Sequence, residues 1–162
     1  MSINIRAIER GDLQHVLELM REFARYEDLE SSLEVTEERL SAAMFDEGAF
    51  VEGLIAFNSD TPIGYAIFYP NFLTFRGQRG YFLEDLYVAQ ESRASGLGKA
   101  FLSLIAKMAQ KRGFERIDFL VLDWNETAIG FYQKLGAVRS TDERHFKFTD
   151  NAFRQLCGYD AS

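Results

Sequence analysis

The sequence predicts one α/β domain of the α+β type, in which a mixed sheet is covered by helices. The chain has 162 residues, a length that suits a single domain over residues 1–162. Its composition, 47% apolar and 27% charged with two prolines, is that of an ordinary globular protein. Strand patterns follow one another in one part of the chain and alternate with helical patterns in another. Hairpin pairing and crossover connections should therefore occur in one sheet.

The first predicted elements are a strand and two helices. Ile3–Ala7 alternates apolar and polar side chains, as a strand with one buried face does. Asp12–Tyr26 has apolar side chains at helical spacing, and Asp12 is a candidate N-cap. Thr36 caps a shorter helix whose first turn carries Glu37 and Glu38, where the helix dipole favours negative charge.

Three strands are predicted next. Ala49–Phe57 and Ile63–Tyr69 are rich in β-favouring residues, and the turn-rich link Asn58–Pro62 predicts a hairpin between them. After a loop at Asn71–Gly80, the segment Gly80–Val88 is dense in aromatic residues. This third strand carries an acidic pair in its middle, which a purely structural strand would avoid.

The second half of the chain alternates helices and strands. A helix begins at Leu97 and is closed by Gly113. A strand is predicted over Ile117–Leu122, a short helix over Thr127–Leu135, and a last strand over His145–Phe148.

Composition excludes several classes of protein. With 18 basic and 25 acidic residues the net charge is −7, which argues against nucleic acid as the main partner. No apolar run approaches the roughly 20 residues of a membrane span, and the first residues do not resemble a secretory leader, so we expect a cytoplasmic protein. Cys157 has no second cysteine to pair with, and two histidines cannot complete a zinc site, so we expect no metal.

The strongest local signal is a glycine-rich loop, Arg93–Gly98, between a strand and a helix. Glycines there let backbone N–H groups approach an anion at the positive end of the helix, and a phosphate is the expected guest. The loop is not a dinucleotide fingerprint, because Phe101 stands where the third glycine would fall. It is not a P-loop, because Ala100 follows Lys99 where Ser or Thr is required. A tight turn that starts a helix is the alternative.

The pattern Arg-x-x-Gly-x-Gly after Leu86–Val88 resembles the coenzyme A loop of the GCN5-related N-acetyltransferases, the GNAT family. Phe119–Glu126 and Phe131-Tyr132 further resemble the diamine and polyamine (spermidine/spermine) branch of that family. The likeness covers nearly the whole chain and is weakest over 58–80 and 138–143. It implies a central mixed, mostly antiparallel sheet flanked by helices on both faces, and acetyl-CoA as co-substrate. The coenzyme-binding residues that it implies are Leu86, Tyr87, Val88, Arg93, Ala94, Ser95, Gly96, Leu97, Gly98, Lys99 and Asn125.

Two side chains are candidate catalysts. An alkylamine is protonated at neutral pH and must lose a proton before it attacks a thioester, so Glu84 is the candidate base. Buried in a strand beside Asp85, one carboxyl of this pair should have a raised pKa; a capped or solvated acidic pair is the alternative. The resemblance assigns Tyr132 as general acid for the departing thiolate, whereas composition alone favours a core aromatic. Asn125 matches a contact to the pantetheine arm, with helix capping as its alternative role.

The expected acceptor is a small cationic amine. The resemblance assigns Tyr26, Glu27 and Glu84 to acceptor binding, and an acidic stretch around Glu27 could attract a polycation, although such runs are more often solvated surface. The chain departs from the polyamine enzymes at 74–76 and 142–144, which leaves lysine-like or thialysine-like amines in play.

The sequence therefore predicts an acetyl-CoA:amine N-acetyltransferase that transfers directly, without an acyl-enzyme. The alternatives are a non-catalytic acyl-CoA sensor and an acetyltransferase of protein lysines or N-termini. The resemblance to the polyamine branch, whose members are dimers, implies a homodimer, and the aromatic-rich C-terminal strand is the candidate interface.

Overall fold

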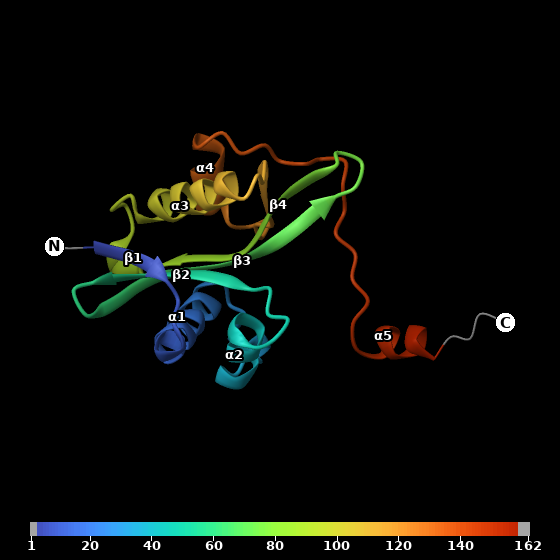
Figure 1. The fold of residues 1–162 in the computed structure, drawn as a ribbon, viewed down its shortest axis with the longest axis horizontal. Coiled ribbons are helices and arrows are strands. Elements are labelled where there is room, and N and C mark those ends of the chain that lie inside the picture. The colour runs from blue at the N-terminus through green and yellow to red at the C-terminus, as the bar shows by residue number, and fades with distance from the viewer. Residues whose placement is uncertain (1–2, 159–162) are drawn as a thin grey trace. The chain divides into compact units, whose positions relative to one another are not determined.

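The computed structural model describes residues 3–158 (Figure 1). The chain divides into two compact units, residues 1–120 and residues 121–162, and each is described by itself. The expectation of a single domain stays a prediction.

The first unit contains a five-stranded sheet with the spatial order β1-β2-β3-β4-β5. The strands are β1 (Ile3–Ala7), β2 (Glu52–Asn58), β3 (Thr61–Leu73), β4 (Gln78–Val88) and β5 (Arg116–Phe119). The first four pair antiparallel, and β5 runs parallel to β4. The predicted mixed, mostly antiparallel sheet is confirmed.

Helices cover both faces of this sheet, as predicted (Figure 1). One face carries α1 (Leu13–Tyr26) and α2 (Glu37–Phe45), and the other carries α3 (Leu97–Lys111). Thr36 caps α2 as expected, because its Oγ1 accepts a hydrogen bond of 3.3 Å from the backbone N–H of Arg39.

The sheet separates two apolar clusters. Side chains of α1 such as Val16 pack against Ile55 and Tyr65 on one face. On the other face Phe101 of α3 packs against Phe68 and Tyr81, which are also completely buried. Each helix buries the apolar stripe that its periodicity predicts, and this packing fixes both helices on the sheet.

The two hairpins are tighter than the sequence suggested. Asn58 pairs with Thr61, so the first turn has two residues rather than five. The predicted loop at 71–80 is mostly strand, because β3 and β4 pair out to Leu73 and Gln78. Pro70 lies within β3 and does not end it. Pairing of β2 with β3 ends at Phe68, and beyond that point β3 has an edge on which proline costs no ladder hydrogen bond.

The second unit contains α4 (Glu126–Lys134) and α5 (Asp150–Cys157). The predicted strand at His145–Phe148 is wrong, because residues 143–149 have no regular structure. Its alternating pattern is that of a strand, but a strand needs a neighbour to satisfy its backbone, and no described strand pairs with this segment.

Asp12 lies at the start of α1, but its carboxylate binds Arg6 instead of capping the helix. The two Arg6–Asp12 contacts measure 2.6 and 2.8 Å, and the backbone N–H of Glu9 donates to the same carboxylate at 2.8 Å. The hydrogen bond from Arg6 lowers the pKa of Asp12, whose side chain is buried. This pair therefore ties β1 to the helix that follows it.

We expect Asp12→Asn to lower the free energy of unfolding by about 2 kcal/mol at neutral pH, because it leaves Arg6 without its buried partner. The loss should shrink as the pH falls through the lowered pKa of Asp12, since the native carboxylate is then protonated as well. Urea denaturation measures both effects. Asp46→Asn is the control, because it breaks an exposed pair with Arg10 and should change stability by less than about 0.5 kcal/mol.

Candidate active site

A β-bulge in β4 places Glu84 outside the regular pairing. The β3–β4 register passes from the Ile67–Asp85 pair to the Phe68–Leu83 pair, so Glu84 has no partner on β3. The extra residue reverses the alternation of side chains along β4. Leu83 faces the cluster under α3, whereas Tyr87 faces the cluster under α1. No local sequence pattern indicates this bulge, which sets the direction of both acidic side chains.

Glu84 is exposed, so the expectation that it is buried is wrong. Its Oε2 accepts a hydrogen bond of 3.1 Å from the hydroxyl of Tyr69. Burial and the charge of Glu84 raise the pKa of Tyr69 to about 12, so this tyrosine remains a donor at physiological pH. Glu84 is thus an oriented carboxylate within reach of solvent.

The carboxyl of the acidic pair whose pKa is raised is Asp85. Burial raises the pKa of Asp85 to about 6, and the nearby charge of Glu84 adds to the effect. The hydroxyl of Tyr65 donates to Asp85 Oδ2 at 3.1 Å and opposes the shift. A raised pKa in this pair was expected, and the bulge decides which member carries it.

The end of α1 adds further acidic and aromatic side chains on the same face of the sheet. Tyr87 donates from its hydroxyl to Glu22 Oε2 at 3.2 Å and stacks on Phe23 with ring centroids 5.2 Å apart. Burial and the charge of Asp85 raise the pKa of Glu27. We call Glu22, Glu27, Asp85, Tyr65 and Tyr87 the acidic cluster; its negative potential suits a cationic ligand.

The glycine loop has the backbone that a phosphate site requires. Ala94 and Gly96 both have positive φ, at 63° and 83°, and α3 begins directly afterwards at Leu97. Ser95 and Lys99 are exposed, and the Ser95 hydroxyl donates to the carbonyl of Ser92 at 2.7 Å. The first N–H groups of α3 have no partners within the helix, so they lie at its positive end. The N–H of Leu97 donates to the Ser95 hydroxyl over a long distance of 3.4 Å. The residues present therefore fit an anionic group such as the pyrophosphate of coenzyme A.

Among the described residues, no strand pairs with the last part of β4 on the side away from β3. Pairing with β5 ends at Leu83, whereas β4 continues to Val88. The N–H of Ala89 donates to Ile63 on β3 at 2.9 Å. Because backbone groups alternate in direction along a strand, those of Leu86 and Val88 point away from β3. They lie where the pantetheine amides were expected to add as a further strand.

The side chain of Arg93 contacts β4 and the end of α1. Its Nε donates to the carbonyl of Val88 at 3.1 Å, and its guanidinium lies 4.3 Å from the ring centroid of Tyr26. The first unit thus brings together Tyr26, Tyr87 and Arg93, three of the residues expected in the site. Asp85 and Glu22 were not among the predicted site residues, although the acidic pair itself was a visible signal.

Two of the expected site residues, Asn125 and Tyr132, belong to the second unit. Asn125 is buried, and its Oδ1 accepts a hydrogen bond of 3.2 Å from the N–H of Ala128, so it caps α4. Tyr132 is partly buried on α4 beside Phe131, with ring centroids 5.1 Å apart. The capping role of Asn125 is confirmed, and the coenzyme roles of both residues stay predictions.

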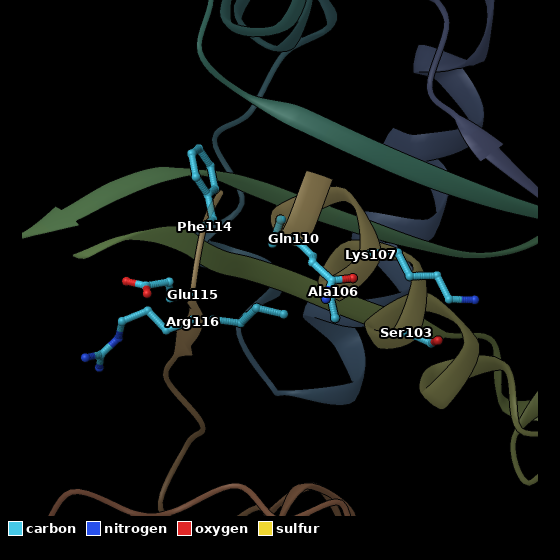
Figure 2. A pocket seen from close by; sticks show the side chains of 9 residues that line it. Ser103, Ala106, Lys107, Gln110, Phe114, Glu115 and Arg116 are labelled. Carbon is cyan, nitrogen blue, oxygen red and sulfur yellow. The ribbon is translucent and has the colours of Figure 1, made fainter. Parts of the chain in front are cut away.

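A separate concavity of about 610 Å³ lies between α3 and β5 (Figure 2). Lys107 and Gln110 of α3 line one side, and Phe114 and Arg116 line the other. It involves the later turns of α3 rather than the glycine loop or the acidic cluster, so it is not the candidate active site. Among residues 3–158, no group of His, Cys, Asp and Glu side chains could hold a metal ion, and no helix could span a membrane.

Asp85 makes a pH-dependent contribution to stability. Its pKa is raised from 3.8 to about 6 in the folded protein, so the folded state binds more protons than the unfolded chain between these values. Stability is therefore lost as the pH rises through this window, and the cost is complete above it. We expect Asp85→Asn to raise the free energy of unfolding by about 2 kcal/mol near pH 8, and by less than about 1 kcal/mol near pH 4. Thermal unfolding at both pH values is the measurement, and an equal gain at both would contradict the assignment.

The chain is similar to known acetyltransferases in both sequence and fold. The model of the acetyltransferase (GNAT) family matches residues 13–137. A thialysine N-epsilon-acetyltransferase from Bos taurus is 34% identical, over 96% of this chain and 98% of its own length. A spermidine/spermine N(1)-acetyltransferase-like protein from Homo sapiens is 30% identical over 86% of this chain and 21% of its own length. Among solved structures, an integron cassette protein from the V. cholerae mobile metagenome has a TM-score of 0.82 at 22% identity, covering 98% of this chain and 99% of that one.

Proposed function

Because the chain belongs to the GNAT acetyltransferase family, we propose that it transfers the acetyl group of acetyl-CoA to the terminal amine of a small, thialysine-like or lysine-like amino acid. The acidic cluster carries this proposal. It offers the carboxylates of Glu22, Glu27 and Asp85 to a cation beside the glycine loop. The similarity of nearly the whole chain to the bovine thialysine enzyme supports an acceptor of that size and charge.

The coenzyme is assigned to the loop and the open edge of β4. Backbone N–H groups of Gly96, Leu97, Gly98 and Lys99 at the start of α3 would hold the pyrophosphate, and Leu86 and Val88 would pair with the pantetheine arm. When bound, acetyl-CoA supplies an activated thioester to the acceptor amine.

Glu84 and Tyr132 are proposed to move the protons. Glu84 accepts a proton from the acceptor ammonium, directly or through a water, and the hydrogen bond from Tyr69 orients its carboxylate for this role. The amine nitrogen then forms the new C–N bond as the C–S bond breaks. Tyr132 donates its hydroxyl proton to the departing sulfur. The acetylated nitrogen then gives up its second proton to the tyrosinate, directly or through a water, and Glu84 releases the first proton to solvent. No nucleophilic side chain is acetylated.

A homodimer is proposed as the assembled state, with a second copy covering the C-terminal segment. Four large apolar side chains of this segment expose between 52% and 87% of their surface: Phe146, Phe148, Phe153 and Leu156. Contiguous exposed apolar surface is a mark of an interaction site. Association with a second copy would bury these side chains. Sedimentation equilibrium measures the mass, and a monomer at micromolar concentration would contradict this arrangement.

Release of coenzyme A from acetyl-CoA, measured with a panel of amines, tests the proposed acceptor. Thialysine should be used with a higher kcat/KM than spermidine or a histone-like peptide. A preference for spermidine would show that the acceptor is a polyamine. A preference for the peptide would favour a protein acetyltransferase, and binding of acetyl-CoA without turnover of any amine would favour a sensor.

Glu27→Gln tests the role of charge in acceptor binding. We expect KM for putrescine to rise about 10-fold and KM for propylamine about 2-fold, because only the diamine retains a second ammonium for the acidic cluster. Steady-state kinetics with both amines gives the comparison. Glu30→Gln removes an exposed charge a short distance along the chain and is the matched control. Equal increases in KM for the two amines would show that Glu27 does not recognise the second charge.

A further inference from the structure

Arg93 joins the glycine loop to the end of α1. It is the first residue of the loop and its Nε is bound to the carbonyl of Val88. Its guanidinium lies 4.3 Å from the centroid of the Tyr26 ring and 5.8 Å from that of Tyr87. Within residues 3–158 no carboxylate lies within ion-pair distance of Arg93. Its charge thus lies over the ring of Tyr26 and also interacts with the hydroxyl of Tyr87.

The two rings differ in how firmly they are held. Tyr87 is buried, stacked on Phe23 and bonded to Glu22, so it provides a rigid support. Tyr26 is 39% exposed and stands in the last position of α1. The chain reverses two residues later, where Asp28 has a φ of +56°. The position of the Tyr26-Glu27 pair therefore depends on what packs against the end of the helix, and Arg93 is one such group.

We propose that Arg93 is a positioning residue that couples the occupancy of the coenzyme loop to the order and amine affinity of the Tyr26-Glu27 segment. This inference rests on the proposed function for the identity of the two ligands. An anion on the N–H groups of 96–99 fixes the backbone that follows Arg93, and the stacked guanidinium transmits that order to Tyr26. The acceptor then binds to a segment that is already ordered. Acceptor binding therefore costs less conformational entropy, and the acceptor affinity rises.

This role differs from that of a phosphate ligand, which the family resemblance alone had suggested for Arg93. A phosphate ligand would contribute to coenzyme affinity whether or not Tyr26 is present. A positioning residue contributes chiefly to the response of the end of α1, and that response should depend on the ring of Tyr26. A cation over an aromatic ring contributes about 0.5 to 2 kcal/mol, enough for a several-fold effect.

Hydrogen exchange read by mass spectrometry tests the coupling without any acceptor. In the wild type, saturating coenzyme A should slow exchange at least about 5-fold both in a loop peptide covering 94–100 and in a peptide covering 22–30. In Arg93→Ala the loop should still be protected by coenzyme A, and the end of α1 should no longer respond. Tyr26→Leu should have the same effect, and the double variant should add nothing further.

Arg10→Ala is the matched control, because Arg10 also stacks on a ring, that of Phe45 at 5.0 Å, but lies far along the chain from the loop. It should keep the wild-type response. A second measurement is the ratio of thialysine dissociation constants without and with coenzyme A, which should be about 5 or more in the wild type and below about 2 in Arg93→Ala.

The outcomes distinguish a failure of the coupling from a failure of the proposed function. If coenzyme A protects neither peptide of the wild type, the coenzyme site fails and the coupling fails with it. If the loop is protected but 22–30 does not respond, or responds equally in Arg93→Ala, the coupling is overturned and the proposed function stands. If both hydrogen-exchange responses follow the expected pattern but thialysine does not bind, the coupling stands and the acceptor assignment is overturned.

Discussion

Tyr132→Phe is expected to lower kcat at least about 100-fold while the dissociation constant for acetyl-CoA changes less than about 2-fold. The substitution keeps the aromatic ring beside Phe131 and removes only the hydroxyl that would protonate the departing sulfur. A positioned general acid contributes about 100-fold to 10,000-fold to a rate, so its loss should appear in kcat rather than in binding. Stopped-flow measurement of coenzyme A release and a binding titration give the two quantities.

Tyr81→Phe is the control for the loss of a tyrosine hydroxyl. The Tyr81 hydroxyl bonds Glu52 and Arg112 and belongs to none of the groups assigned to catalysis. This variant should lose some stability and keep its kcat at a temperature well below its unfolding midpoint. A Tyr132→Phe variant that retained more than about a third of the wild-type kcat would show that another group protonates the thiolate.

Gly96→Val is expected to raise the dissociation constant for acetyl-CoA about 100-fold. Gly96 has a φ of +83°, a conformation that a β-branched residue adopts only at a cost of about 1 to 3 kcal/mol, so the turn into α3 should change. The N–H groups that follow would then no longer converge on one anion. Isothermal titration with acetyl-CoA gives the affinity.

Gly77→Val separates this local effect from general strain. Gly77 lies in the β3–β4 turn with a φ of +59° and, like Gly96, has no atom close to the position of a Cβ. Both variants should lose comparable stability, but only Gly96→Val should lose coenzyme affinity. Equal affinity in Gly96→Val and the wild type would exclude the loop as the pyrophosphate site.

The order and type of elements in residues 3–120 could be predicted from the sequence. Each helix buries one apolar stripe and so carries helical periodicity. The central strands β2 and β3 are buried on both faces and are therefore short apolar runs bounded by turn residues. The apolar stripe of α1 and the cap at Thr36 are local features of this kind. The failure at His145–Phe148 has the opposite cause. The alternating pattern there shows that the segment could form a strand with one buried face. A strand also needs a second strand to pair with, and the local sequence does not specify one.

The candidate site was predictable in composition but not in geometry. The Glu84-Asp85 pair stands out in the sequence because acidic residues are unusual in a strand. Arg93–Gly98 stands out because its two glycines lie between a strand and a helix. The bulge that exposes Glu84 and turns Asp85 toward Tyr65 depends on the register of two strands. The stacking of Arg93 on Tyr26 joins residues distant in sequence, so no local pattern could indicate it.

The central claim is direct acetyl transfer to a small amine, and the position of the acetyl group after reaction tests it most directly. Thialysine and acetyl-CoA labelled in the acetyl group are incubated with the protein, and the products are identified by mass spectrometry. The account predicts one label on the side-chain amine for each coenzyme A released, and none on the protein. Release of coenzyme A without labelled amine, or label retained on the protein, would contradict it.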